Sequence, residues 1–281
     1  MVWGASPRIS FADSVQFVSG STVLGQTGAV TVNATDVLAP WKSRLGISTS
    51  LAAGSAGNRF DLLLTDAASL DQVFTLRGAL ALGLPGGLEA AITLPYVKGE
   101  SDQSSTQGVG SLTMSAKWSV MDQSGWIPGV ALSTSWITDT GREIGTSSVT
   151  TNGYLASVSA QLGLASGDWA WTILAEAGGF WRDPGRTESN SSLEYGVAGI
   201  VPLGRTGFSE ETGEFQFVAE INGTSARQDV TGQPDDATSF APGLRYMTKR
   251  WGASATGTFT TYEQGAKKSS AGALVEFHIV L

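Results

Sequence analysis

The sequence lacks cysteine and has only one histidine, so the usual metal-binding side chains are scarce. Without cysteine there are no disulfides and no thiolate metal sites. A single histidine leaves too few nitrogen ligands for a histidine-based metal centre, so we expect neither a metal nor a cofactor. The chain also lacks any run of about 18 apolar residues, which excludes a membrane-spanning helix.

Charge is scarce as well. Charged residues make up 15% of the 281 residues, and the net charge is −8. Binding to nucleic acid needs a basic patch, whereas the basic residues here are dispersed and Lys249-Arg250 is no more than a pair. We therefore expect no nucleic-acid partner.

Glycine and tryptophan are abundant instead, with 36 and nine residues. The stretch 168–181 reads DWAWTILAEAGGFW: its odd positions are all apolar, and its even positions are mixed and include Glu176. Alternate residues of a strand point to opposite faces. Strands of soluble proteins usually run for about 5–6 residues, so this pattern predicts an unusually long strand with one wholly apolar face.

The same alternation recurs along the chain and predicts about twelve strands. It is clear over 72–84, 87–96, 110–120, 191–203, 213–223 and 271–281. It is weaker over 43–52, 127–137, 151–164, 238–247 and 250–261. Residues 59–64 (RFDLLL) predict one more short strand inside a connection.

The connections alternate in length. One set is mostly short: 85–86, 121–126, 165–168, 247–250 and the longer 204–212. The other set is long and polar: 53–71, 97–109, 138–150, 182–190, 224–237 and 262–270. Short periplasmic turns, long extracellular loops and an even strand number are typical of bacterial outer-membrane barrels. A soluble β-sandwich, the alternative, would bury its apolar face in a dry core and use shorter strands.

The sequence thus predicts an all-β fold: a transmembrane, antiparallel, up-and-down β-barrel of about 12 strands in the bacterial outer membrane. Residues 41–281 form this barrel. Residues 1–40 fit the pattern less well, and three interpretations stay open for them: an N-terminal extension, a partial plug, or the start of the first strand.

The two faces of the predicted strands receive different roles. Aromatic residues near strand ends predict an interfacial girdle: Tyr96, Trp126, Trp136, Trp169, Trp181, Trp251 and Tyr262. Charged residues on the opposite face predict a polar lumen, lined by Arg77, Glu89, Lys117, Glu176, Glu194, Glu220, Arg245, Glu276 and His278. Glu176 would then point into the barrel, where water or a basic partner can meet it.

The lumenal charges have two interpretations. They form either a salt-bridge network that holds the barrel together or a ring that selects or orients solutes. Strand adjacency suggests that Glu220 lies near Arg245 and that Arg77 lies near Glu89.

Several segments together resemble the outer-membrane proteins of the phenol-degradation meta-pathway family. In that family a glycine-rich entry leads to a strand ending in a lysine–aromatic pair, and a proline–glycine begins the next strand. The matching residues in GVGSLTMSAKWSVMDQSGWIPGVALSTSWITDTG (108–141) are Gly108, Gly110, Lys117-Trp118 and Pro128-Gly129. The segments GLPGGLEAAITLPYV (83–97) and PGLRY (242–246) also look like parts of the family.

The sequence departs from the family at a few positions. Ser111 stands where the family usually has aspartate, and Asp139-Thr140-Gly141 stands for Pro-Thr-Gly. The last residue is Leu281 in place of the phenylalanine common in such barrels. The resemblance implies a channel or transporter for small compounds, hydrophobic ones included.

Three functions follow as hypotheses. The first is a porin-like channel for passive passage of small solutes, with outer-membrane lipid and lipopolysaccharide around it. The second is a structural barrel that scaffolds an envelope complex with a protein partner. The third is a lipid hydrolase using serine, His278 and a carboxylate. Because no serine is marked out by the pattern, we expect the chain not to be an enzyme.

Overall fold

The computed structural model describes most of the chain. The described residues are 20–22, 26–29, 31–53, 71–100, 105–138, 142–145, 152–166, 169–182, 191–203, 213–226, 236–264 and 266–281. Among these residues there is no helix that is long and apolar enough to cross a membrane.

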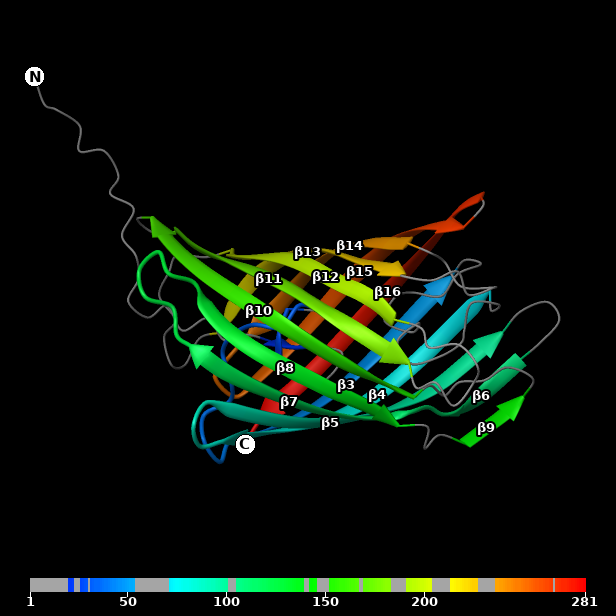
Figure 1. Cartoon of the computed structure of the whole chain (residues 1–281), viewed down its shortest axis with the longest axis horizontal. Coiled ribbons are helices and arrows are strands. Elements are labelled where there is room, and N and C mark those ends of the chain that lie inside the picture. Colours follow the sequence, from blue (N-terminus) through cyan, green and yellow to red (C-terminus); the bar gives the residue numbers. More distant parts are fainter. Residues whose placement is uncertain are drawn as a thin grey trace, which may run out of the picture.

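Twelve antiparallel strands close into a barrel (Figure 1). They are β3 (Ser43–Ala53), β4 (Gln72–Leu84), β5 (Leu88–Glu100), β7 (Leu112–Met121), β8 (Gly129–Thr138), β10 (Gly153–Ser166), β11 (Trp169–Arg182), β12 (Ser191–Pro202), β13 (Glu214–Ala226), β14 (Asp236–Met247), β15 (Trp251–Gln264) and β16 (Ala266–Val280). Each strand pairs with the next in the chain, and β16 pairs with β3. This ring leaves no unpaired edge, and it confirms the predicted fold class.

The predicted strand centres are correct, but most strands are longer than predicted on the long-loop side. β5 runs to Glu100, where the pattern ended at 96, and β15 and β16 continue their ladder up to Gln264↔Ala266. The predicted long loop 262–270 is therefore wrong. The apolar–polar alternation in the sequence stops before the strands do, because backbone hydrogen bonds can continue the sheet without it.

The described residues also form four short strands. β6 (Ser105–Val109) pairs with β5, and β9 (Arg142–Gly145) pairs with β6, so both extend the wall past the barrel. Parts of the predicted loops 97–109 and 138–150 are thus strand. β1 (Gly20–Ser21) and β2 (Thr27–Gly28) form a separate pair. The predicted strand at 59–64 lies outside the described residues.

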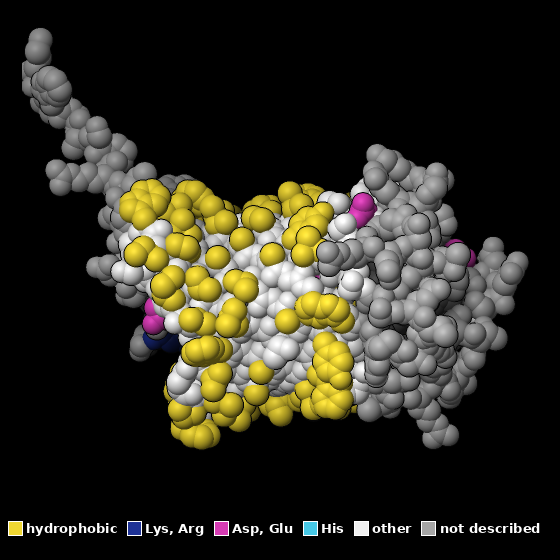
Figure 2. Space-filling model, in the orientation of Figure 1, with side chains coloured by type: hydrophobic (Ala, Val, Ile, Leu, Met, Phe, Trp, Pro, Cys, Tyr) yellow, Lys and Arg dark blue, Asp and Glu magenta, His cyan; other side chains and the backbone are white. Residues whose placement is uncertain are grey.

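The outer face of the barrel is apolar and exposed. On β4, outward Leu76 and Leu80 alternate with inward Thr75 and Arg77, and exposure alternates with them. Figure 2 shows apolar side chains spread over the outer wall, with acidic and basic side chains only at the ends of this surface. An apolar surface of this size needs a lipid environment.

Candidate functional site: the lumen and its inner segment

Residues 31–38, here called the inner segment, lie inside the barrel and form hydrogen bonds with six of its strands. The segment leads to β3 at the barrel end that carries the short turns (Figure 1). Trp41 donates its backbone N–H to the carbonyl of Gly83 there, over 2.8 Å. A Cβ at Gly83 would lie 2.2 Å from the carbonyl oxygen of Ala39, so the close approach requires glycine. Gly83 is therefore a packing glycine within β4.

Glu220 of β13 binds the first part of the inner segment. Its carboxylate accepts the backbone N–H of Thr31 (3.0 Å) and of Val32 (3.3 Å). It also accepts hydrogen bonds from the Thr31 hydroxyl and, at 2.7 Å, from the Asn222 amide. The side chain of Glu220 is fully buried. A buried carboxylate needs several donors, and the inner segment supplies most of these.

Glu176 of β11 binds the next residue. Its carboxylate accepts the backbone N–H of Asn33 over 2.8 Å and the Asn33 side-chain amide over 2.9 Å. The Ser157 hydroxyl donates to it as well. The structure therefore explains this glutamate in an apolar strand: it faces the lumen and binds the inner segment.

Three wall residues hold the rest of the segment. Gln161 of β10 accepts the backbone N–H of Thr35 (3.1 Å). Lys117 of β7 donates to the carbonyls of Asp36 (2.5 Å) and Ala34 (3.3 Å). Glu89 of β5 accepts the backbone N–H of Leu38 over 2.9 Å.

Glu89 also joins two buried cations. Its carboxylate lies 3.8 Å from Arg44 and 3.9 Å from Lys117. All three side chains are at most 2% exposed. Glu89 thus offsets part of the positive charge of the two buried cations where the inner segment approaches the wall.

An apolar cluster packs the same segment against the wall. Val32 and Ala34 are buried, and their cluster is completed by Ala29, Leu174, Ala198, Ile200, Val218 and Leu274. The wall residues of this cluster are inward-facing apolar positions on β11, β12, β13 and β16. The inner face is therefore not uniformly polar, because its apolar positions meet the apolar residues of the segment.

The structure places all nine predicted lumenal residues on the inner face, and all but Glu176 and Glu276 are buried. Both predicted partner pairs are wrong. Register sets Arg245 opposite Gln216, which accepts a hydrogen bond from its Nε over 2.5 Å, whereas Glu220 lies opposite Ala241. Arg77 donates to Ser50 (3.3 Å), and Glu89 lies opposite Gly83, six positions further along β4. Adjacent strands do not bring side chains together unless their register does.

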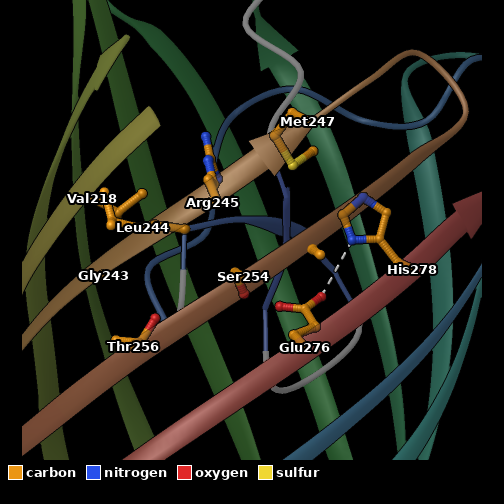
Figure 3. Close-up of a pocket in the computed structure, with 11 residues that line it drawn as sticks. Val218, Gly243, Leu244, Arg245, Met247, Ser254, Thr256, Glu276 and His278 are labelled. Atoms are coloured by element: carbon orange, nitrogen blue, oxygen red, sulfur yellow. Dashed lines mark ion pairs between the residues drawn. The ribbon is translucent and has the colours of Figure 1, made fainter. Parts of the chain in front are cut away.

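Glu194, Glu276 and His278 stand apart from the inner segment's hydrogen bonds named above. Glu194 accepts hydrogen bonds from Ser192 and Thr224 of its own wall, at 3.0 and 2.9 Å. His278 Nδ1 lies 3.5 Å from Glu276 Oε1, and a dashed line in Figure 3 marks this ion pair. This pair lines a small hollow that also touches Arg245 and Ser254. A serine, a histidine and a carboxylate thus line one hollow, but His278 is 4% exposed and closed off from lipid.

Other polar side chains line the lumen beside the nine that the sequence predicted. Arg44 lies at an inward position of β3, and Gln161 and Asn222 lie at inward positions of β10 and β13. Their parity within the predicted strands could have indicated them. The inner segment itself carried no such signal, because its conformation follows the wall and not a period of its own.

The predicted girdle residues are exposed where the structure describes their side chains; they lie on wall strands except for Trp126, which lies in the turn between β7 and β8. Tyr96, Trp126, Trp136, Trp181 and Trp251 are all exposed, whereas the side chains of Trp169 and Tyr262 are outside the description. Trp136 stacks on Tyr154 at 6.3 Å. Trp251 lies 5.3 Å from Tyr246 and 6.1 Å from Phe277. Their role as an interfacial girdle stays a prediction.

Comparison with solved structures finds the same fold in other outer-membrane proteins. An outer membrane channel from Pseudomonas putida F1 is 14% identical, with a TM-score of 0.55 over 90% of this chain and 100% of that chain. The beta domain of the Bordetella autotransporter Brka is 11% identical, with a TM-score of 0.51 over 86% and 100%. LpxR from Salmonella typhimurium is 9% identical, with a TM-score of 0.50 over 83% and 99%.

No protein-family model and no curated protein matches the sequence. The resemblance to the meta-pathway family therefore stays a prediction. The fold similarity and the apolar exterior together confirm the predicted outer-membrane location. By fold, the chain is an outer-membrane β-barrel of twelve antiparallel strands.

Proposed function

We propose that this protein is an outer-membrane channel for small solutes, closed at rest by its inner segment. The observation that carries the proposal is the burial of the lumenal charges. Arg77 and Lys117 are each 1% exposed, and Glu220 is 0% exposed. Side chains lining an open aqueous lumen would be solvated. The inner segment covers Lys117 and Glu220, and Thr22 lies beside Arg77.

The way the inner segment is held supports a displaceable plug. In the described sheet, the wall strands pair only with one another, so the inner segment is not part of the barrel's β-ladders. Its contacts are side-chain hydrogen bonds and small apolar residues, and water can replace the former when the segment leaves. A twelve-stranded barrel lies between filled eight-stranded barrels and wide porins, so clearing the lumen would give a narrow channel.

The resemblance of the sequence to the meta-pathway family extends the proposal to hydrophobic solutes among the small ones. The scaffold hypothesis predicts the same closed lumen but no conductance under any condition. Hydrolysis would require His278 to reach lipid, and unchanged activity toward lipid after His278→Ala would remove that hypothesis.

Asn33→Asp tests the plug directly. The substitution is nearly isosteric, and it places a carboxylate oxygen where the side-chain amide now donates to Glu176 over 2.9 Å. Repulsion between two carboxylates in a poorly solvated site should displace the segment. In planar bilayers we expect steady conductance steps from Asn33→Asp and rare openings from the wild type. Asn33→Ala, which removes the donor without adding charge, is the matched control and should open less.

A second variant acts from the wall. A Cβ at Gly196 would lie 2.6 Å from Cγ2 of Val32, so Gly196→Val should exclude the segment by volume. Heat-dependent gel mobility establishes that each variant is folded. Silent bilayers from both folded variants would contradict the channel and leave the scaffold.

A further inference from the structure

We infer that the lumenal wall recognises the main chain of an extended peptide, and that short peptides are among the solutes of this barrel. The inference rests on the proposed function, because the site becomes accessible only when the inner segment leaves it. The segment is then the resident ligand of a site that other chains can occupy.

Most contacts between the wall and the segment involve backbone atoms. Wall side chains accept the N–H groups of Thr31, Val32, Asn33, Thr35 and Leu38. Lys117 donates to the two carbonyls of Ala34 and Asp36. Wall carboxylates and the Gln161 amide thus face backbone N–H groups, and the Lys117 ammonium group faces backbone carbonyls. The wall places these groups in the order in which an extended peptide presents its donors and acceptors.

Fewer wall contacts involve the side chains of the inner segment than its backbone. The Thr31 hydroxyl and the Asn33 amide meet the same carboxylates as their own backbone N–H groups. The Asp36 carboxylate accepts a hydrogen bond from Gln161 over 3.1 Å. Asn222 donates to the Thr31 hydroxyl (3.1 Å), and the Asn33 amide donates to Ser133 (3.5 Å). Backbone contacts still outnumber side-chain contacts, so the wall reads mainly features that every peptide shares.

Packing adds a preference for small residues. Val32 is 1% exposed and Ala34 is 0% exposed within the apolar cluster. Val32 fills the space beside Gly196, where even a Cβ would lie 2.6 Å from it. Larger side chains at these two positions would clash, so alanine- and valine-like residues fit best.

A peptide can replace the water that enters when the inner segment leaves, which gives a reason for exchange. Glu220 and Glu176 need donors, and water supplies them only until a peptide binds. An incoming peptide supplies the same N–H groups that the inner segment supplies, so the two compete for one set of carboxylates. Because main-chain donors are fixed in spacing, a sugar or an aromatic solute of similar size would not reproduce them.

The test is binding of labelled peptides to folded Asn33→Asp protein in detergent, followed by fluorescence anisotropy. The probes are the octapeptide TVNATDVL, octa-alanine, and TVNATDVL with N-methyl groups on its valine 2 and asparagine 3. We expect the first two to bind within about tenfold of each other, and the N-methylated one at least about tenfold more weakly, because it loses donors to charged acceptors. Val32→Asp, which also displaces the segment, serves if Asn33→Asp does not fold.

Wall variants in the same background sharpen the test. Glu220→Gln should weaken TVNATDVL at least about tenfold. Glu276→Gln, an inward carboxylate that pairs with His278, should leave binding unchanged. Equal binding of the N-methylated peptide, or no binding at all, overturns the inference. Silent bilayers overturn the channel instead, so the two failures are distinguishable.

Discussion

The outer and inner faces of this barrel are made by the same strands, and neighbouring residues meet opposite environments. Ile221 is 56% exposed on the outer face, whereas Glu220, the residue before it, is 0% exposed on the inner face. In a soluble protein these values would be exchanged. The exposed fraction of a side chain therefore does not show what stabilises it in this barrel. The outer face depends on lipid, and the inner face depends on the inner segment.

The two faces also differ in the kind of contact that stabilises them. The outer face needs only apolar volume, so many residues fit at each position. The inner face needs specific donors and acceptors, as the contacts of Glu176 and Lys117 show. Substitutions on the two faces should therefore fail for different physical reasons.

The largest effect is expected for a charge at the middle of the outer face. Val197 is 53% exposed near the centre of β12. Val197→Arg should lower the free energy of unfolding by about 2–4 kcal/mol, because a cation at the bilayer midplane is poorly solvated. Urea titration of the protein folded into vesicles measures this. Leu203→Arg, just past the end of the same strand, should cost about 0–1 kcal/mol. Equal losses would mean that β12 does not face lipid.

A smaller effect is expected from removing an acceptor on the inner face. Glu176→Ala leaves the backbone and side-chain N–H groups of Asn33 without their carboxylate. The free energy of unfolding should fall by about 1–3 kcal/mol, the usual cost of unsatisfied buried donors. Glu176→Gln keeps one oxygen acceptor and should cost less. If both variants unfold at the wild-type urea concentration, the inner segment does not depend on this contact.

The smallest effect is expected at the edge of the outer face. Trp251 contacts Tyr246 and Phe277, at ring distances of 5.3 and 6.1 Å. Trp251→Leu keeps an apolar side chain but loses the ring contacts, so the unfolding free energy should drop by about 0.5–1.5 kcal/mol. Trp118→Leu, a lipid-facing ring on β7 outside this cluster, is the control. A larger loss for Trp118 than for Trp251 would contradict a stabilising role for the ring cluster.

Much of the barrel wall could be predicted because the alternation of side-chain direction acts between neighbouring residues. Alternation placed Glu176, Glu220 and Lys117 on the inner face correctly, since side-chain direction in a strand depends only on parity. The strand ends on the long-loop side were misjudged, because hydrogen-bonded pairing such as β15 with β16 continues without an apolar signal.

The partners of the lumenal charges could not be predicted from adjacency. Arg245 meets Gln216 because the register between β13 and β14 sets them opposite each other, and no local pattern states that register. The inner segment was a harder case, since residues 31–38 have neither strand nor helix periodicity. Their conformation depends on donors and acceptors contributed by β5, β7, β8, β10, β11 and β13.

By itself, the sequence determined the number of strands, the direction of each face and the membrane environment, because parity and hydrophobicity act within a few residues. Only the tertiary structure decided what fills the lumen and which groups pair there. Those contacts join residues as far apart as Thr31 and Glu220, 189 positions along the chain. They exist only because closing the ring brings six strands to face one short segment.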